Sequence, residues 1–286
     1  MKQDVDAFLG YMVRERGYSP NTVAAYRNDL NQLMAHIEAE KQRGIIKSSR
    51  EVLKGYLLRL RERKYSLATA ARKIASTRCF FKFMVDSGKL SEDPTENLIS
   101  VPVAKHPRNF LPPSDYRLLL AEPAKLSTPE ARRDIVMLEV LYATGLRASE
   151  LVSLNVRDID CERNCLHCGC GNSKREVPFN HHTSQLLRGF MKNDRLDLLF
   201  DEREEALFLN LRGQRLTRQG FWQIVKNYAG KAGLSSKVTP QALRHSFALN
   251  RLQSGADIRS VQQLLGHAYV SSTRAYERSY PKEGRE

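Results

Sequence analysis

The sequence predicts a mainly α-helical protein with a small antiparallel β-sheet, arranged as two domains. Apolar residues recur at three- to four-residue spacing along most of its 286 residues, as on the buried face of a helix. The stretch 101–115 lacks this repeat and contains four prolines, which predicts an extended linker. Only the stretch 156–179 has strand character, with a turn at 169–173.

The first domain, residues 1–100, is expected to be a bundle of four or five helices. Its first helix has an apolar face and ends at Gly17, and Ser19 and Pro20 begin the second. Ser66 is suited to cap the fourth helix, which ends near Gly88. The expected apolar faces are Val5, Phe8, Leu9 and Met12, then positions 23–37, 52–60 and 70–85.

We assign residues 101–113 to the linker and residues 114–286 to a second domain of mixed α and β character. A helix is expected at Ser114, and another after Thr128 and Pro129 that breaks at Gly145 and resumes to residue 154. Helices are also expected from Ser184 and over residues 217–232. The sequence contains no internal repeat.

The stretch 238–280 is predicted to form two helices, a turn and a short last helix. Pro240 suits the first turn of a helix that carries Arg244 and stops at Gly255. A second helix, over 258–265, stops at Gly266 and leaves His267 outside it. The last helix carries Tyr276, with N-caps available at residues 271–273.

The positive net charge of the chain indicates a polyanionic partner. There are 46 Lys and Arg against 32 Asp and Glu, a net charge of +14 that is spread along the chain, which favours nucleic acid. No apolar run reaches the roughly 18 residues of a membrane span, and the N-terminus is not typical of a signal peptide. We therefore expect a cytoplasmic protein without membrane contact, with its five cysteines reduced.

A tyrosine, two arginines and a histidine can together cleave a phosphodiester without a metal ion. A tyrosine can act as the nucleophile. Arginines bind phosphate oxygens bidentately and stabilise the charge that develops there, and a histidine can donate a hydrogen bond or transfer a proton. Tyr276, Arg147, Arg244 and His267 offer these groups, and neither a Walker loop nor a carboxylate cluster of the metal-nuclease kind is present.

Five motifs give the whole chain its resemblance to a known family. GYSPNTVAAYRNDL resembles the N-terminal core-binding domain of tyrosine recombinases of the phage integrase family, and ATGLRASEL the box of the first catalytic arginine. LRHSFA and LLGH resemble the boxes of the second arginine and the later histidine, and STRAY places Tyr276 nine residues after His267. In size and layout the chain looks like the bacterial Xer-type enzymes.

The resemblance implies a SAM-like core-binding domain followed by an α+β catalytic domain. It implies that Tyr276 attacks a phosphate and forms a 3′-phosphotyrosyl link. Arg147, Arg244 and His267 would stabilise the transition state of this step. It also implies double-stranded DNA with an inverted-repeat core site as partner, and no cofactor. Four protomers would exchange strands through a Holliday junction, as a homotetramer or as a heterotetramer with a second recombinase.

Two positions depart from the family's pattern. Gln241 stands where a histidine is usual, three residues before Arg244; glutamine can donate a hydrogen bond but cannot titrate. In the hairpin, Cys170 stands at the position of the lysine that serves as general acid. We favour Lys174 as the acid, with Arg175 or no dedicated acid as the rivals.

DNA contacts are expected from cationic groups outside the core of the first domain and beside the site of the second. The first set is Arg27, Arg72, Lys73 and Lys82, and the second is Arg175 and His245. Cys161, Cys165, Cys168 and Cys170 do not have the spacing of a standard zinc finger, so reduced thiols are expected and no metal site. The rival functions are a silent DNA-binding protein of this fold and a relaxing topoisomerase.

Overall fold

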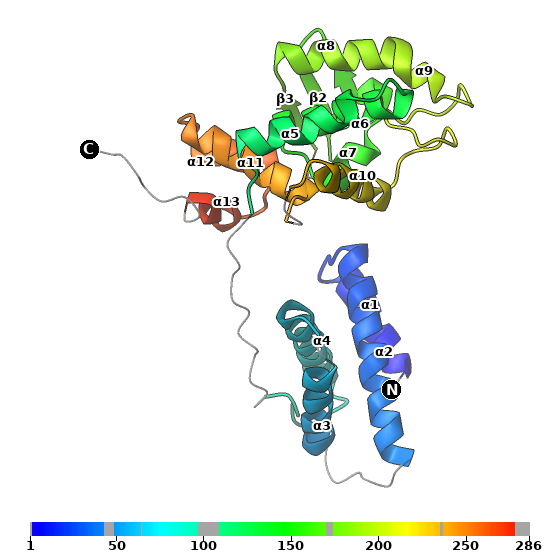
Figure 1. Cartoon of the computed structure of the whole chain (residues 1–286). Coiled ribbons are helices and arrows are strands. Elements are labelled where there is room, and N and C mark those ends of the chain that lie inside the picture. The colour runs from blue at the N-terminus through cyan, green and yellow to red at the C-terminus, as the bar shows by residue number, and fades with distance from the viewer. Residues whose placement is uncertain are drawn as a thin grey trace. The chain divides into compact units, whose positions relative to one another are not determined.

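The computed structural model describes residues 2–42, 49–63, 65–96, 109–169, 174–234 and 237–277 (Figure 1). The chain divides into two compact units, Met1–His106 and Pro107–Glu286, and each has its own hydrophobic core. The predicted fold class is confirmed, since helices dominate both units and a three-stranded antiparallel sheet lies in the second. Within the described residues, no helix is both long and apolar enough to cross a membrane.

The first unit contains four described helices: α1 (Lys2–Arg14), α2 (Pro20–Gln42), α3 (Ser49–Glu62) and α4 (Leu67–Asp86). The apolar face predicted for α1 is confirmed, because Val5, Phe8, Leu9 and Met12 are buried against α2 and α4. The predicted cap is confirmed as well: the Ser66 hydroxyl accepts a hydrogen bond of 3.2 Å from the Thr69 backbone N–H.

The predicted linker lies mostly outside the described residues, but its last part, 109–113, belongs to the second unit. Leu111 is buried in the core of that unit, and its backbone N–H donates to the Ser246 hydroxyl at 2.6 Å. The carbonyl oxygen of Asn109 is 3.0 Å from Nδ1 of His245. The linker boundary at residue 113 stays a prediction; Leu111, two residues earlier, already anchors the chain in the core of the second unit.

The second unit is built around helix α6 (Pro129–Thr144), which packs against α5 (Pro113–Ala124), α8 (His181–Gly189) and α11 (Pro240–Gln253). The helix predicted after Thr128 and Pro129 is present, and Thr128 caps it: its hydroxyl accepts the Ala131 backbone N–H at 3.3 Å. The other helices are α7 (Ala148–Ser153), α9 (Arg195–Asp197), α10 (Arg218–Lys231), α12 (Ile258–Leu265) and α13 (Val270–Glu277), with a 3₁₀ turn at Val156–Asp158 and a π turn at Phe190–Asp194.

Two helix starts differ from the expectation. Helix α8 begins at His181, three residues before Ser184, because the Asn180 side chain accepts a hydrogen bond of 2.8 Å from the Thr183 backbone N–H. Helix α13 begins at Val270, so the hydroxyl residues 271–273 lie in its first turn rather than before it.

The sheet has the order β1 (Ile159–Asp160), β2 (Cys165–Cys168) and β3 (Arg175–Pro178). Leu166 pairs with Val177, and both side chains are buried in the core of the unit. Because side chains alternate along a strand, the neighbouring pair His167 and Glu176 faces outward and is exposed. Residues 170–173 of the intervening turn lie outside the described residues.

Gly145 ends α6 in the left-handed conformation, with φ of 63°, and a Cβ there would lie 2.2 Å from Cδ1 of Phe247. We expect Gly145→Ala to lower the free energy of unfolding by about 2–5 kcal/mol, of which about 1–2 kcal/mol comes from the left-handed backbone and about 1–3 kcal/mol from the overlap. Chemical denaturation of the purified protein measures this loss.

Gly233→Ala is the matched control, because Gly233 has a φ of 65° and open space where its Cβ would lie. It should lose only the backbone contribution, about 1–2 kcal/mol. Equal losses in the two variants would show that the approach of Phe247 to Gly145 is unimportant.

Candidate active site

Arg147 lies between two helices at the point where the chain leaves α6. After Gly145, Arg147 takes extended backbone and becomes the N-cap of α7. The Glu150 carboxylate accepts the Arg147 backbone N–H at 2.7 Å and its guanidinium at 2.9 Å. Glu150 therefore both caps α7 and orients Arg147.

Two further arginines bind the same carboxylate. Arg175, at the start of β3, holds Glu150 bidentately, with nitrogen–oxygen distances of 2.9 and 3.0 Å. Arg244, on α11, approaches to 3.7 Å. A single carboxylate whose side chain is 12% exposed thus joins three segments that are far apart in the sequence.

The same three guanidinium groups also bind the C-terminal end of α12. Arg175 donates to the carbonyl oxygen of Leu264 at 2.7 Å. Arg244 donates to that of Leu265 at 2.6 Å, and Arg147 to that of Gly266 at 2.8 Å. The last carbonyls of a helix lack partners within the helix and carry partial negative charge. The arginines satisfy them, and so fix the position of His267, the next residue.

These contacts shift the ionisation of the groups involved. Burial raises the pKa of Glu150, but the hydrogen bonds from Arg175 and from the Arg147 backbone outweigh it and lower the pKa to about 2. For Arg244, burial and then the nearby Arg147 lower the pKa to about 10, so the guanidinium stays charged at neutral pH. The site therefore combines one buried anion with three cations.

We expect Glu150→Gln to lower the free energy of unfolding by about 3 kcal/mol at pH 7, because it leaves the guanidinium groups without their anion. The folded-state pKa lies below the unfolded value near 4.5, so the stabilisation is complete above about pH 4.5. It is lost as the pH falls toward 2. The difference between wild type and variant should therefore shrink over that range, as denaturation at several pH values will measure.

Glu205→Gln is the control, because Glu205 forms an exposed pair with Arg157 at 3.3 Å. An exposed pair contributes about 0–1 kcal/mol, so this variant should remain near wild type at every pH. A Glu150→Gln variant that is as stable as Glu205→Gln would contradict the role assigned to Glu150.

His267 and Tyr276 lie side by side beyond α12. Their rings are nearly parallel, at an interplanar angle of 6° and a centroid distance of 6.3 Å. Nδ1 of His267 is 2.9 Å from the Thr273 hydroxyl, which ties the imidazole to α13. The ring of His245 meets that of Tyr276 edge-on at 5.4 Å. Tyr276 is only 3% exposed, packed in a small apolar cluster with Phe247, Val261 and Leu265.

Lys174 and Gln241 lie on the surface of the second unit. Lys174 is exposed directly before β3, and Gln241 is exposed on the first turn of α11, one turn before the buried Arg244. Arg175, expected at the DNA and as a rival acid, is instead held by Glu150 and Leu264. Burial lowers the pKa of Arg175, but its bonds to Glu150 raise it overall, which suits a positioning group. His245, also expected at the DNA, is 9% exposed.

Among the cationic residues expected in the first unit, Lys73 is not outside the core. Its ammonium group is buried and binds Asp29 at 2.9 Å and Gln32 at 2.8 Å, because a buried charge needs a partner. Arg72 binds the same aspartate from a half-exposed position. Arg27 is exposed and paired with Asp6 at 2.8 Å, and Lys82 is exposed on α4.

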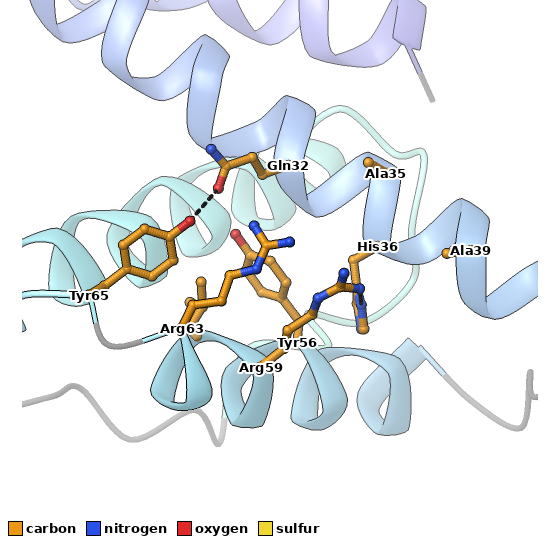
Figure 2. A pocket seen from close by; sticks show the side chains of 9 residues that line it. Gln32, Ala35, His36, Ala39, Tyr56, Arg59, Arg63 and Tyr65 are labelled. Atoms are coloured by element: carbon orange, nitrogen blue, oxygen red, sulfur yellow. Dashed lines mark hydrogen bonds between the residues drawn. The ribbon is translucent and has the colours of Figure 1, made fainter.

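The sequence reasoning missed a small basic pocket in the first unit. It has a volume of about 160 Å³ and lies between α2 and α3 (Figure 2). Arg59 and His36 line it, 3.5 Å apart, together with Arg63 and the hydrogen-bonded pair Tyr65 and Gln32. The two arginines are four residues apart, so a sequence signal for one helix face existed, but His36 comes from another helix.

The cysteines expected as reduced thiols are free where they are described. Cys168 packs in the core, and burial raises its pKa to about 11. Cys161 packs at the edge of the same core, whereas Cys165 lies on the other face of β2. The described thiols therefore do not converge; Cys170 lies outside the described residues.

Comparison with known proteins supports the family resemblance over nearly the whole chain. Residues 109–283 match the model of the phage integrase family, and residues 5–88 match its N-terminal SAM-like domain. Tyrosine recombinase XerC of Roseiflexus sp. (strain RS-1) is 43% identical over 279 residues, which cover 96% of this chain and 89% of the relative. Tyrosine recombinase XerD of Listeria monocytogenes serotype 4b (strain F2365) is 37% identical, with coverage of 96% and 94%.

Solved structures share the fold. The integrase of the Tn1549 transposon, in complex with a circular intermediate DNA, superposes with a TM-score of 0.75 at 20% identity, covering 96% of this chain and 94% of that one. The XerH site-specific recombinase, bound to a palindromic difH substrate, gives a TM-score of 0.71 at 22% identity, with coverage of 96% and 91%.

Proposed function

This chain belongs to the phage integrase family and is a DNA-cleaving and rejoining enzyme of the tyrosine recombinase type, and we propose that it recombines specific sites through a covalent link to Tyr276. One observation carries the proposal: two arginines, a histidine and a tyrosine from distant segments meet in one unit. Arg244 and Arg147 bind the carbonyls of residues 265 and 266, and His267 stacks on Tyr276.

The proposed chemistry starts with attack of the Tyr276 phenolic oxygen on the scissile phosphorus. The bond to the 5′-oxygen breaks, the protein keeps a 3′-phosphotyrosyl ester, and the phenol loses its proton. Arg147 and Arg244 neutralise the non-bridging oxygens, and His267 donates a hydrogen bond to one of them. The 5′-hydroxyl of a partner strand then reverses the step. Because the phosphoester is exchanged rather than hydrolysed, no external energy source is required.

The leaving 5′-oxygen requires a proton, and we propose that Lys174 supplies it. Lys174 is exposed directly before β3, and the next residue, Arg175, belongs to the arginine cluster formed by Arg147, Arg175 and Arg244. The neighbouring Arg175 is the poorer candidate because its guanidinium is bound by Glu150 and its pKa is raised. A general acid must give up its proton readily in the transition state.

DNA binding is supported by the net charge of +14 of the whole chain and by the recombinases of the same fold that were solved with DNA. We propose four protomers on two inverted-repeat sites, either identical or paired with a second recombinase. Exposed Arg27 and Lys82 and half-exposed Arg72 remain proposed phosphate contacts of the first unit.

Tyr276 is buried in the free protein, so α13 must shift before the hydroxyl reaches a phosphate.

A nicked DNA substrate tests the proposal. Cleavage next to a nick releases a short fragment, so that religation fails and the covalent complex accumulates. We expect a protein–DNA adduct that resists denaturing electrophoresis and is digested by protease. Site binding without any adduct would support the silent DNA-binding protein, which the exposed Gln241 in place of a histidine favours. Relaxation of supercoils without exchange between two sites would instead indicate a topoisomerase.

A further inference from the structure

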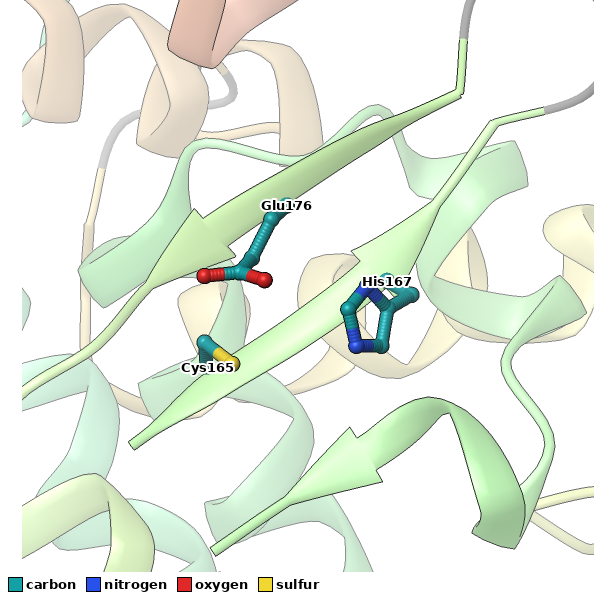
Figure 3. A group of neighbouring side chains, drawn as sticks. All are labelled: Cys165, His167 and Glu176. Atoms are coloured by element: carbon teal, nitrogen blue, oxygen red, sulfur yellow. The ribbon is translucent and has the colours of Figure 1, made fainter. Parts of the chain in front are cut away.

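Three potential metal ligands converge on the outer face of the sheet, away from the arginine cluster. Cys165 and His167 are two residues apart on β2, so they share one face, and His167 is paired across the sheet with Glu176 on β3 (Figure 3). The thiol sulfur, an imidazole nitrogen and a carboxylate oxygen all lie within 4.8 Å of one another. The register of the hairpin, rather than sequence proximity alone, brings the three together.

The chemistry of this set suits zinc. Zn²⁺ binds thiolate sulfur, imidazole nitrogen and carboxylate oxygen at about 2.0–2.3 Å. Ligands around a tetrahedral ion at those distances are roughly 3.5 Å apart, so small rotations of these side chains suffice. A thiolate and a carboxylate together neutralise a divalent cation, and the thiol proton is released to solvent on binding. Cys165 is 2% exposed, whereas the other two ligands are open to solvent.

We propose that Cys165, His167 and Glu176 form a zinc site that ties β2 to β3, with a water molecule in the fourth coordination position. This set differs from the four cysteines that the sequence brings to attention. Only Cys165 belongs to both, because Cys168 faces the core and Cys161 packs at the core's edge.

Two charged side chains lie next to these ligands. Arg163 pairs with Glu176 at 3.3 Å in an exposed position, and a metal ion would displace this weak pair. Asp160 is paired with Cys165 across the sheet, but its Oδ1 already accepts the backbone N–H groups of Glu162 and Arg163 at 3.0 and 2.9 Å. Asp160 therefore stabilises the turn, and its oxygens are not among the ligand atoms that lie within 4.8 Å of one another.

The site lies at the base of the hairpin that carries Lys174. Glu176 is two residues after Lys174, and Arg175 between them holds Glu150. A metal ion that joins the two strands would restrict the hairpin and the position of that lysine. This consequence depends on the proposed function, whereas metal binding itself does not.

Binding is tested on the full-length, tag-free protein, stripped with a chelator and kept reduced by a phosphine. Co²⁺ is the optical probe, because a thiolate ligand gives it an intense charge-transfer absorption in the near ultraviolet. We expect one equivalent of Co²⁺ to produce that band. One equivalent of Zn²⁺ should then abolish it by displacing the Co²⁺. Zinc at about 100 times its dissociation constant should also raise the melting temperature by the order of 5 °C.

Variants assign the ligands. His167→Ala and Glu176→Gln alter exposed side chains, so both should fold and bind at least about tenfold more weakly, while Cys165→Ala should lose the thiolate band. Cys79→Ser and Cys161→Ser are the matched controls and should bind as wild type does. Absence of the band in wild type overturns the proposal. So does a band that survives Cys165→Ala, or one that depends on Cys161 or Cys170 but not on His167. None of these results bears on DNA cleavage, which the nicked substrate measures separately.

Discussion

Replacing Tyr276 by phenylalanine is expected to abolish the covalent protein–DNA adduct while leaving site binding within about twofold of wild type. The substitution removes only the oxygen that is proposed to attack the phosphate and form the phosphoester. The ring remains and can keep its stacking on His267 and its edge contact with His245, so the fold should be preserved. Adduct formation on the nicked substrate and a binding titration measure the two properties.

Tyr269→Phe is the matched control. Tyr269 lies seven residues earlier on the same segment and is 74% exposed, so loss of its hydroxyl should leave adduct yield unchanged. An adduct that persists in Tyr276→Phe, or one that disappears in Tyr269→Phe, would assign the nucleophile to another residue.

Replacing Lys174 by alanine is expected to slow cleavage by about 10²–10⁴-fold, the contribution of a general acid. A substrate with sulfur in place of the scissile 5′-oxygen should restore the rate to within about tenfold. A thiol has a pKa near 8.5, so a thiolate leaves without being protonated. Single-turnover cleavage of the oxygen and sulfur substrates by both proteins measures the effect and its rescue.

Lys192→Ala provides the comparison, since Lys192 is an exposed lysine of the same unit. It should cleave both substrates at the wild-type rate. If Lys174→Ala slows the two substrates equally, Lys174 contributes to DNA binding rather than to proton transfer. If it slows neither, another group is the acid.

Local signals made most of the helices predictable. A Ser66 or Thr128 hydroxyl satisfies a backbone N–H of the next turn, and these contacts depend on residues three apart. The left-handed Gly145 and Gly266 end helices for an equally local reason. Two findings show where local signals no longer suffice. Helix α13 begins earlier than its hydroxyl residues suggested. Leu111 anchors the chain in the core of the second unit, because it is buried against residues that are distant in the sequence.

The candidate site was predictable in its members but not in its arrangement. Arg147, Arg244, His267 and Tyr276 could be named from motifs, because the chemistry of phosphate requires those side chains. That Arg175 belongs with Glu150 rather than facing outward could not be read from the sequence, since the two are 25 residues apart. The burial of Lys73 against Asp29 was missed for the same reason, since these two residues are 44 positions apart.

The sequence by itself predicted the fold class and most of the helix ends, because periodicity and capping act within a few residues of each other. Its motifs also indicated the family, and through that resemblance the residues that we propose for strand transfer. Only the tertiary structure decided which charges neutralise one another. Three guanidinium groups bind between Glu150 and the last carbonyls of α12, and three metal-binding atoms meet across β2 and β3. Electrostatic and coordination contacts require distances of a few ångströms, and packing alone brings such distant residues that close.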